Sequence, residues 1–267
     1  MGPEQDSRSE GTALRVRLAE GEEDVRAAQA LRFAVFHHEM GAALSASSIA
    51  AGLDRDRYDD LADHLLVEDM SDGAPKVVGT YRLLRQSVAE GHGGFYSAGE
   101  FDLAPLIGHA AMQGQSLLEL GRSCVAPGYR DSGTIQLLWR GIASYLAEHR
   151  IGQMFGCASF FGTDPQEHEA ALTYLYHQHL APADLRTRAR EAGRIEMERL
   201  ALGSYDQRLA MRALPPLIKA YLRVGACVGD GAWLDRDFNT IDIFVLMPVA
   251  AITARYSDRF GAARIAA

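Results

Sequence analysis

The sequence predicts a mixed α/β protein in which a central sheet is flanked by helices. Short apolar stretches with strand-like alternation are interleaved with longer stretches in which apolar residues recur at helical spacing. The composition is that of a globular protein, because 48% of the residues are hydrophobic and 23% are charged. A length of 267 residues is enough for one large domain with a substantial core.

The N-terminal quarter begins with a polar, aperiodic segment, so we expect a disordered tail over residues 1–12. Residues 14–18 alternate between apolar and charged side chains, as a half-buried strand does. Residues 22–39 have helical spacing and an acidic first turn, and predict a helix. The small, polar and acidic residues 41–60 predict a loop.

The next elements are two strands at 64–68 and 77–84, joined by the turn-forming residues 71–75 into a hairpin. Residues 116–125 predict a central strand, and residues 134–149 predict an amphipathic helix.

A further strand is expected at 153–159. Asp164 and Pro165 then suit the first positions of a helix that ends near Leu180. The last hundred residues predict a helix at 215–224, a glycine-rich turn at 225–231 and a strand at 241–247. Because no linker precedes them, we expect residues 13–163 to form the core and residues 164–267 to complete the same domain and its cleft.

Composition excludes some functions. A net charge of −8 argues against general nucleic-acid binding. The chain lacks a signal segment and a membrane-length apolar run, so we expect a cytoplasmic protein, with peripheral contact to a membrane as the alternative. The three cysteines and nine histidines lack metal-binding spacing, so no metal is expected. The arginines of 186–199 fit a solvated helix face, or a surface for an acidic partner or anionic lipid.

The strand at 116–125 carries the most informative residues. Glu119 and Arg122 interrupt an apolar stretch, so they form a structural ion pair, serve function, or both. A bulge at Gly121 would bring both to one side, splay the strand and free a backbone N–H for a thioester carbonyl. Beyond it, Arg130 and the start of the following helix offer a cation and unpaired amides, which suit a phosphate.

Residues 130–134 resemble the phosphate-binding motif of GNAT acyltransferases, although Ile135 stands where that superfamily prefers Gly or Ala. A longer series of motifs is similar to the L-ornithine Nα-acyltransferases, which use 3-hydroxyacyl carrier protein to make lyso-ornithine lipid. The series comprises residues 31–36, 54–60, 63–67, 79–84, 119–125, 214–219 and 235–242. A fainter likeness to acyl-homoserine-lactone synthases rests on the order Arg, acidic cluster, Arg, Glu-x-x-Arg.

The resemblance implies a GNAT fold with a C-terminal α/β extension. It also implies an N-acyltransferase that moves a 3-hydroxyfatty acyl group from acyl carrier protein to the α-amine of ornithine. Such an enzyme holds no permanent cofactor, and acyl-phosphopantetheine, on acyl carrier protein or CoA, is its donor substrate. Two alternatives remain open at this point: a synthase of the N-acyl amino-acid or homoserine-lactone type with another acceptor, and a non-catalytic module that binds acyl carrier protein.

The chemistry needs a base for the attacking amine, and Glu119 is our candidate, with Arg122 beside it. The acceptor would be bound by four charged residues: Arg32, Asp60, Asp63 and Arg82. The acidic loop also fits a merely solvated surface, and Arg32 also fits a structural ion pair. The phosphopantetheine arm would meet Val125, Arg130, Ser132, Gly133 and Thr134. Tyr174 or Tyr176 would protonate the leaving thiolate, unless both are core aromatics. Neither Ser123 nor Cys124 has an evident partner for nucleophilic catalysis.

Overall fold

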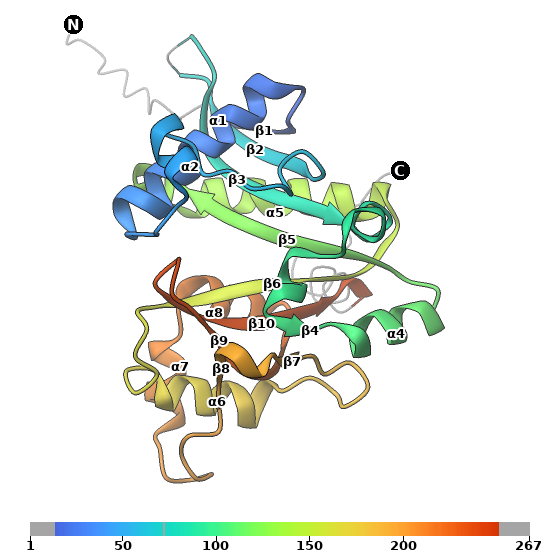
Figure 1. Ribbon diagram of the computed structural model, residues 1–267, viewed down its shortest axis with the longest axis vertical. Helices are drawn as coiled ribbons and strands as arrows, with labels where there is room; N and C mark the ends of the chain where they lie inside the picture. The colour runs from blue at the N-terminus through green and yellow to red at the C-terminus, as the bar shows by residue number, and fades with distance from the viewer. Residues whose placement is uncertain (1–13, 72, 251–267) are drawn as a thin grey trace, which may run out of the picture.

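The structure is a computed structural model that describes residues 14–71 and 73–250 (Figure 1). The tail predicted for residues 1–12 lies outside these ranges. The strands are β1 (Leu14–Leu18), β2 (Asp63–Asp69), β3 (Lys76–Arg85), β4 (Phe101–Asp102), β5 (Ser116–Val125), β6 (Ile151–Phe161), β7 (Arg188–Ala189), β8 (Arg194–Ile195), β9 (Cys227–Asp235) and β10 (Thr240–Pro248). The α-helices are α1 (Glu22–Arg32), α2 (Ala46–Ala51), α3 (Gln86–Ala89), α4 (Ala104–Met112), α5 (Ser132–Glu148), α6 (Glu169–His179), α7 (Gln207–Ala213) and α8 (Pro216–Arg223). The π-helical and 3-10 turns are η1 (Phe33–Glu39), η2 (Glu90–His92), η3 (Tyr96–Gly99), η4 (Pro127–Tyr129) and η5 (Glu191–Gly193).

The strands form a single mixed sheet in the order β1-β2-β3-β5-β6-β10-β9-β7-β4, with β8 also paired to β9. Neighbours are antiparallel except β5 with β6 and β7 with β9. Helix α5 makes the crossover between the parallel strands β5 and β6, as a parallel pair requires. The predicted mixed α/β class is therefore confirmed, with the N-terminal strands above and the C-terminal strands below in Figure 1.

The main apolar cluster lies under α5, α6 and α8 and draws on both halves of the chain. It includes Leu65 and Ile142 from before residue 163, and Leu175 and Ile243 from after it. A second cluster, around Phe101, Phe155 and Phe244, supports the other face of β6 and β10. The sheet and its main core thus continue across the middle of the chain.

Several predicted elements differ from the observed ones. The stretch 225–231 is not a glycine-rich turn, since β9 begins at Cys227, and the positive φ of 81° at Gly231 lets its backbone bend within that strand. Helix α6 begins at Glu169 rather than at Asp164, whose carboxylate instead accepts the amide of Gln166 in a turn. Helix α4 and the short α2 were not predicted.

The arginine run at 186–199 is also not a helix face. Its short strands β7 and β8 pair with β9, and Arg188 and Arg194 make ion pairs with Asp230. Among the described residues, no helix combines the length and the apolar character that crossing a bilayer requires.

Candidate active site

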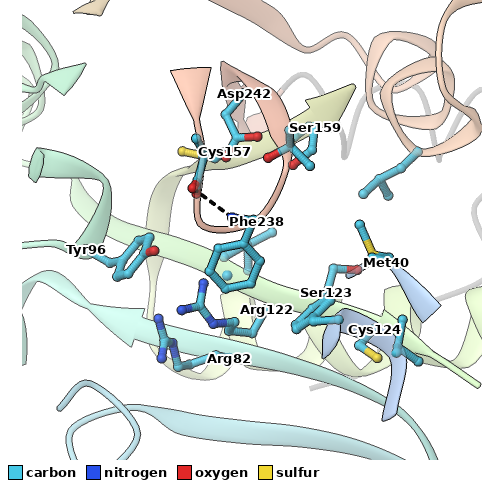
Figure 2. A pocket seen from close by; sticks show the side chains of 18 of the residues that line it. Met40, Arg82, Tyr96, Arg122, Ser123, Cys124, Cys157, Ser159, Phe238 and Asp242 are labelled. Carbon is cyan, nitrogen blue, oxygen red and sulfur yellow. Dashed lines mark hydrogen bonds between the residues drawn. The ribbon is translucent and has the colours of Figure 1, made fainter. Parts of the chain in front are cut away.

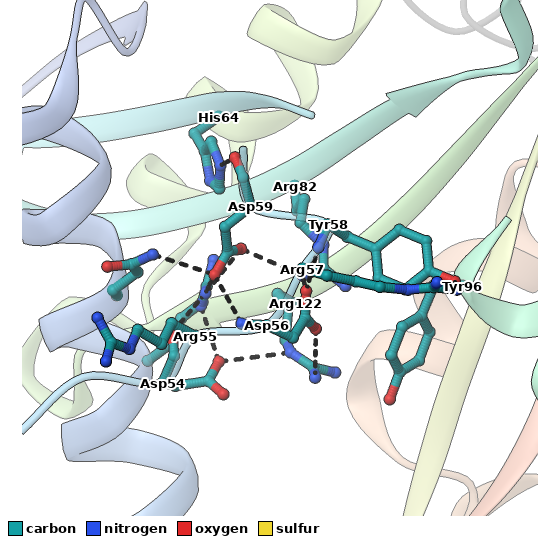
Figure 3. Close-up of polar contacts among 12 residues, drawn as sticks. Asp54, Arg55, Asp56, Arg57, Tyr58, Asp59, His64, Arg82, Tyr96 and Arg122 are labelled. Carbon is teal, nitrogen blue, oxygen red and sulfur yellow. Dashed lines mark hydrogen bonds and ion pairs between the residues drawn. The ribbon is translucent and has the colours of Figure 1, made fainter. Parts of the chain in front are cut away.

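Three arginines from different elements meet on the loop at 54–59 (Figure 3). They come from α1, β3 and β5. With three aspartates they alternate in a closed ion-pair ring, with nitrogen-to-oxygen distances of 2.7 to 3.4 Å: Arg32, Asp59, Arg82, Asp56, Arg122, Asp54 and back to Arg32. Three positive and three negative charges cancel, which makes burial of all six groups tolerable.

Arg32 is the innermost member of the ion-pair ring, with no exposed surface. The prediction that it pairs with a carboxylate of this loop is confirmed, and it does not line the cavity described below. Burial would raise the pKa of Asp59, but Arg32 and Arg82 more than offset this and hold that pKa at about 2. Asp59 is therefore ionised at neutral pH.

A bulge in β5 directs Arg122 toward this ring. Thr80 pairs with Cys124 and Arg82 with Gly121, so two residues of β5 lie opposite one residue of β3. Arg122 takes up the extra length with a φ of 51°, a value that is uncommon outside glycine. The bulge predicted at Gly121 is thus present one residue further on, and it brings both Glu119 and Arg122 to the same cavity.

The strand splays as expected from that bulge. The parallel pairing of β5 with β6 runs from Ser116 to Glu119 and ends there, while β6 continues along β10. A cavity of about 310 Å³ opens between the two strands (Figure 2). Its polar lining includes Arg82, Tyr96, Glu119, Arg122, Ser159 and Asp242.

The guanidinium of Arg122 lies between two aromatic rings. Its carbon is 4.6 Å from the ring centroid of Phe238 and 4.9 Å from that of Tyr96. Arg82 lies 5.3 Å from the same Tyr96 ring. The aromatic rings and the ion-pair ring fix both guanidinium groups at the cavity wall, where a carboxylate would find two preorganised cations.

Glu119 is buried and holds the turn η3 in place. Its two carboxylate oxygens accept the backbone N–H groups of Tyr96 and Ser97, each at 2.7 Å. Burial raises the pKa of Glu119 above its ordinary value, and the hydrogen bonds from Ser97 and Tyr96 oppose the rise. The side chain lines the cavity, so it can serve both as an anchor for η3 and as a proton acceptor.

The predicted phosphate-binding amides at the start of α5 are not free. The carboxylate of Asp131 caps this helix by accepting the N–H groups of Gly133 and Thr134, at 2.8 and 3.0 Å. Ser132 is the first residue of the helix, and Thr134 is buried beneath it. The Asp131 carboxylate thus accepts two of the amides expected to meet a phosphate, and phosphate binding at these residues stays a prediction.

The cation predicted for the phosphate is also engaged. Arg130 forms a bidentate pair with Glu39, at 2.5 and 2.6 Å, and donates its Nε–H to the carbonyl of Val125. Arg130 and Val125 do line the cavity, at the end nearer Cys124. They remain candidates for contact with a pantetheine arm, whereas the helix start lies beyond the lining.

Other predicted site residues lie elsewhere. Asp60 is exposed, and Asp63 accepts a hydrogen bond from Tyr145 and lies 3.4 Å from Arg85. Tyr174 and Tyr176 are half-buried on α6 and pack against the main core. None of these four predicted residues lies among those lining the cavity.

Two potential nucleophiles line the cavity without activation. Burial raises the pKa of the Cys124 thiol to about 12, so it stays protonated at neutral pH. Its sulfur contacts the carbonyl of Leu31, and Ser123 is adjacent. In the part of the chain described, no histidine is hydrogen-bonded to either, which agrees with direct attack by the amine.

Sequence reasoning missed three polar residues of this region: Tyr96, Glu100 and Asp242. Asp242 did carry a signal, since it is the one charged residue in the apolar strand Thr240–Pro248. Tyr96 and Glu100 lie in an irregular segment without any periodic pattern of apolar residues.

Comparison with known proteins relates this geometry to a family. The chain is 45% identical to an L-ornithine Nα-acyltransferase of Agrobacterium fabrum over 93% of its length and 85% of that protein. It is 43% identical to one of Brucella abortus, over 94% of this chain and 89% of that protein. The chain belongs to the L-ornithine Nα-acyltransferase family. It is therefore an N-acyltransferase, and a profile described as "Acetyltransferase (GNAT) domain" matches its residues 31–140.

Solved structures agree on the fold of this family member. An N-acyl amino acid synthase from uncultured soil microbes superposes with a TM-score of 0.54 at 12% identity, covering 94% of this chain and all of the other. A CoA-dependent acyl-homoserine lactone synthase gives 0.50 at 16%, covering 94% and 98%. At such low identity these likenesses establish the GNAT fold alone.

Proposed function

We propose that this acyltransferase moves a 3-hydroxyfatty acyl group from acyl carrier protein to the α-amine of L-ornithine, giving lyso-ornithine lipid. The observation that carries the proposal is the 42–45% identity with L-ornithine Nα-acyltransferases over more than nine-tenths of the chain. The splayed β5–β6 cavity, with cationic donors and a buried glutamate on its wall, supports the same reaction.

The acceptor carboxylate would bind to Arg82 and Arg122. The ion-pair ring uses Nη1 of Arg82 and Nη2 of Arg122 in its shortest contacts, which leaves other N–H donors of each guanidinium for a ligand. Arg122 is the more accessible of the two, with 12% of its side chain exposed against 3% for Arg82. Binding there would place the α-amine near the splay point of β5, beside Glu119.

The chemistry would be direct attack of the amine on the thioester carbon. The C–N bond forms, the C–S bond breaks, and the α-ammonium loses two protons in becoming an amide nitrogen. One proton balances the leaving thiolate and the other passes to solvent through Glu119, whose raised pKa suits a proton acceptor. Backbone N–H groups of β5 beyond Glu119, which no longer face β6 as a partner, would stabilise the oxyanion.

The donor would enter between β5 and β6 at the Val125 and Arg130 end of the cavity. Asp131 caps α5 and accepts two of its first amides. The phosphate of the donor would therefore bind there only if Asp131 turned away, or it would be held by the carrier protein itself. The second possibility favours acyl carrier protein over CoA. A product with one acyl chain partitions into membranes, so we place the enzyme in the cytoplasm with peripheral contact to the inner membrane face.

The test incubates purified protein with ornithine and either 3-hydroxyacyl carrier protein or the matching CoA thioester, with mass spectrometry of the products. We expect N-acylornithine, formed faster from the carrier protein. Failure to acylate ornithine with either donor would rule the proposal out, and a higher rate with CoA would overturn the choice of donor. An acceptor screen in the same assay detects a synthase specific for another amine.

The role of Glu119 is tested with Glu119→Gln. If Glu119 accepts the proton, kcat falls by about 10²–10⁴-fold and the residual activity loses the acidic limb of the wild-type pH profile. If it only anchors η3, the variant instead loses stability and binds ornithine weakly, with the pH profile unchanged. The side-chain NH2 group of glutamine cannot accept a hydrogen bond, so the variant loses one of the two backbone N–H bonds that Glu119 accepts. Thermal unfolding of the variant is therefore measured in parallel, to separate lost stability from lost catalysis.

A further inference from the structure

Two buried carboxylates lie side by side at the cavity wall, where Asp242 is a lining residue and Glu100 lies next to it outside the lining. Glu100 follows η3 and is 9% exposed, and Asp242 lies on β10 and is 7% exposed. A carboxylate oxygen of Glu100, a carboxylate oxygen of Asp242 and the sulfur of Cys157 all lie within 4.8 Å of one another. The Cys157 thiol donates to Glu100 at 3.4 Å. Figure 2 shows Asp242 and Cys157 facing the cavity opposite Arg122.

This pair lacks the cation that buried carboxylates normally require. Over residues 14–71 and 73–250, neither Glu100 nor Asp242 takes part in an ion pair. Oδ1 of Asp242 is buried and has no hydrogen-bond partner within the same ranges. An unpaired acceptor in such a place costs free energy unless a ligand satisfies it.

The ionisation of the pair agrees with a missing cation. Burial, and then the charge of Asp242, raises the pKa of Glu100 to about 8. Burial raises the pKa of Asp242 to about 6. The other charged groups acting on the pair are Asp235, which raises both pKa values, and Arg122, which lowers both.

We propose that Glu100 and Asp242 form the subsite that binds the side-chain ammonium of the acceptor and selects a diamino acid. The inference rests on the proposed function for the identity of the acceptor. Arg82, Arg122 and Asp242 line the same cavity, and the carboxylate of Glu100 lies within 4.8 Å of that of Asp242. That arrangement matches an α-carboxylate at one end and a terminal ammonium at the other.

The carboxylates of the 54–63 segment are less available to an ammonium. Asp54, Asp56 and Asp59 are neutralised within the ion-pair ring. Asp60 is exposed, and Asp63 accepts a hydrogen bond from Tyr145 and pairs with Arg85.

The test compares ornithine with norvaline, which has the same carbon skeleton without the terminal amine. We measure kcat/KM for both in the wild type, Asp242→Asn and Glu100→Gln. Loss of a charged hydrogen bond should lower kcat/KM for ornithine by about 10- to 100-fold. Norvaline should change by less than about threefold, so that the ornithine preference collapses. Asp237→Asn, an exposed carboxylate on the same β9–β10 hairpin, should preserve the wild-type preference.

Either of two kinetic outcomes overturns the subsite. One is an unchanged ornithine-to-norvaline ratio in both variants; the other is an equal loss for both substrates, which would indicate a structural or catalytic role. Stoichiometric metal in the wild type that disappears in Asp242→Asn would also overturn it.

Titration calorimetry of ornithine and norvaline, without donor, separates this result from the proposed function. Tighter ornithine binding that Asp242→Asn abolishes supports the subsite even if no acyl transfer occurs, and equal binding of the two amino acids refutes it.

Discussion

The close approach of β5 to β6 at the point where they begin to splay depends on one glycine, and replacing it is a direct test of the cavity geometry. Gly156 lies in β6 just past the last residue paired with β5. A Cβ built on it would lie 2.2 Å from the carbonyl oxygen of Leu120, which is backbone and cannot rotate away. Gly156→Ala must therefore push β5 and β6 apart at the residues next to Glu119.

The size of the effect follows from the overlap. A carbon and an oxygen need a separation of about 3.2 Å, so the strands must move by about 1 Å at this point. Overpacking of this kind costs about 3 kcal/mol, and the backbone position places it at the upper end of the usual range. For a chain of this size, this corresponds to a fall in Tm of roughly 6–12 °C. A shift of about 1 Å beside the reacting groups should lower kcat/KM by about 10²-fold.

The assay combines thermal unfolding with acylation kinetics for Gly156→Ala and a control. Gly108→Ala in α4 is the control, because its new methyl group meets nothing within 4 Å and should raise stability by about 0.5–1 kcal/mol. The argument would be refuted if Gly156→Ala unfolded within about 1 °C of the wild type and kept its activity. Such a result would mean that the strands part without the close approach at Leu120.

Two further predictions concern buried charge. Arg32→Met leaves Asp54 and Asp59 without one of their cations, so it should lower the free energy of unfolding in urea titrations by about 3–5 kcal/mol. The double variant Arg32→Met, Asp59→Asn should recover part of this loss. A loss below about 1 kcal/mol in Arg32→Met would contradict the ion-pair ring as a structural unit. Burial and the charge of Asp242 raise the pKa of Glu100 from 4.5 to about 8, so the folded state binds more protons than the unfolded state between those values. Stability should therefore fall as pH rises from 5 to 8, by on the order of 3 kcal/mol, and Glu100→Gln should remove this slope; an equal slope in that variant would show that Glu100 is not its source.

The elements that sequence could predict are those whose pattern is local. Residues 116–125 form β5 with the bounds expected, because an apolar stretch that ends at a turn needs no tertiary information to be recognised. The bulge was also predictable, since Gly121 lies between two charges that must face one cavity. Helix α6 was misplaced at its start because Asp164 and Pro165 fit a helix cap and a free turn equally well.

The functional partners were less predictable, because they come from packing between distant segments. Sequence analysis named Arg32, Arg82 and Arg122, but which carboxylate each one meets depends on how α1 and the 54–59 loop pack on β3 and β5. Asp131 was a visible N-cap, so the occupied amides of α5 could have been expected from the sequence. Glu100 was beyond reach, since only the fold brings η3 against β10.

The distribution of charge explains why a diamino acid suits this cavity better than a neutral one. The ion-pair ring contributes no net charge, so the balance of the site is set by the carboxylates outside it: Glu119, Glu100, Asp242 and Asp235. Ornithine carries a net positive charge at neutral pH, whereas most amino acids carry none. Its terminal ammonium favours ionisation of the acid pair, and its carboxylate meets the guanidinium groups. Without a ligand, the buried carboxylates are unfavourable because they lack a cation, and binding of ornithine supplies one. The residues that select the acceptor thereby also orient its α-amine toward the splay point, where the acyl group arrives.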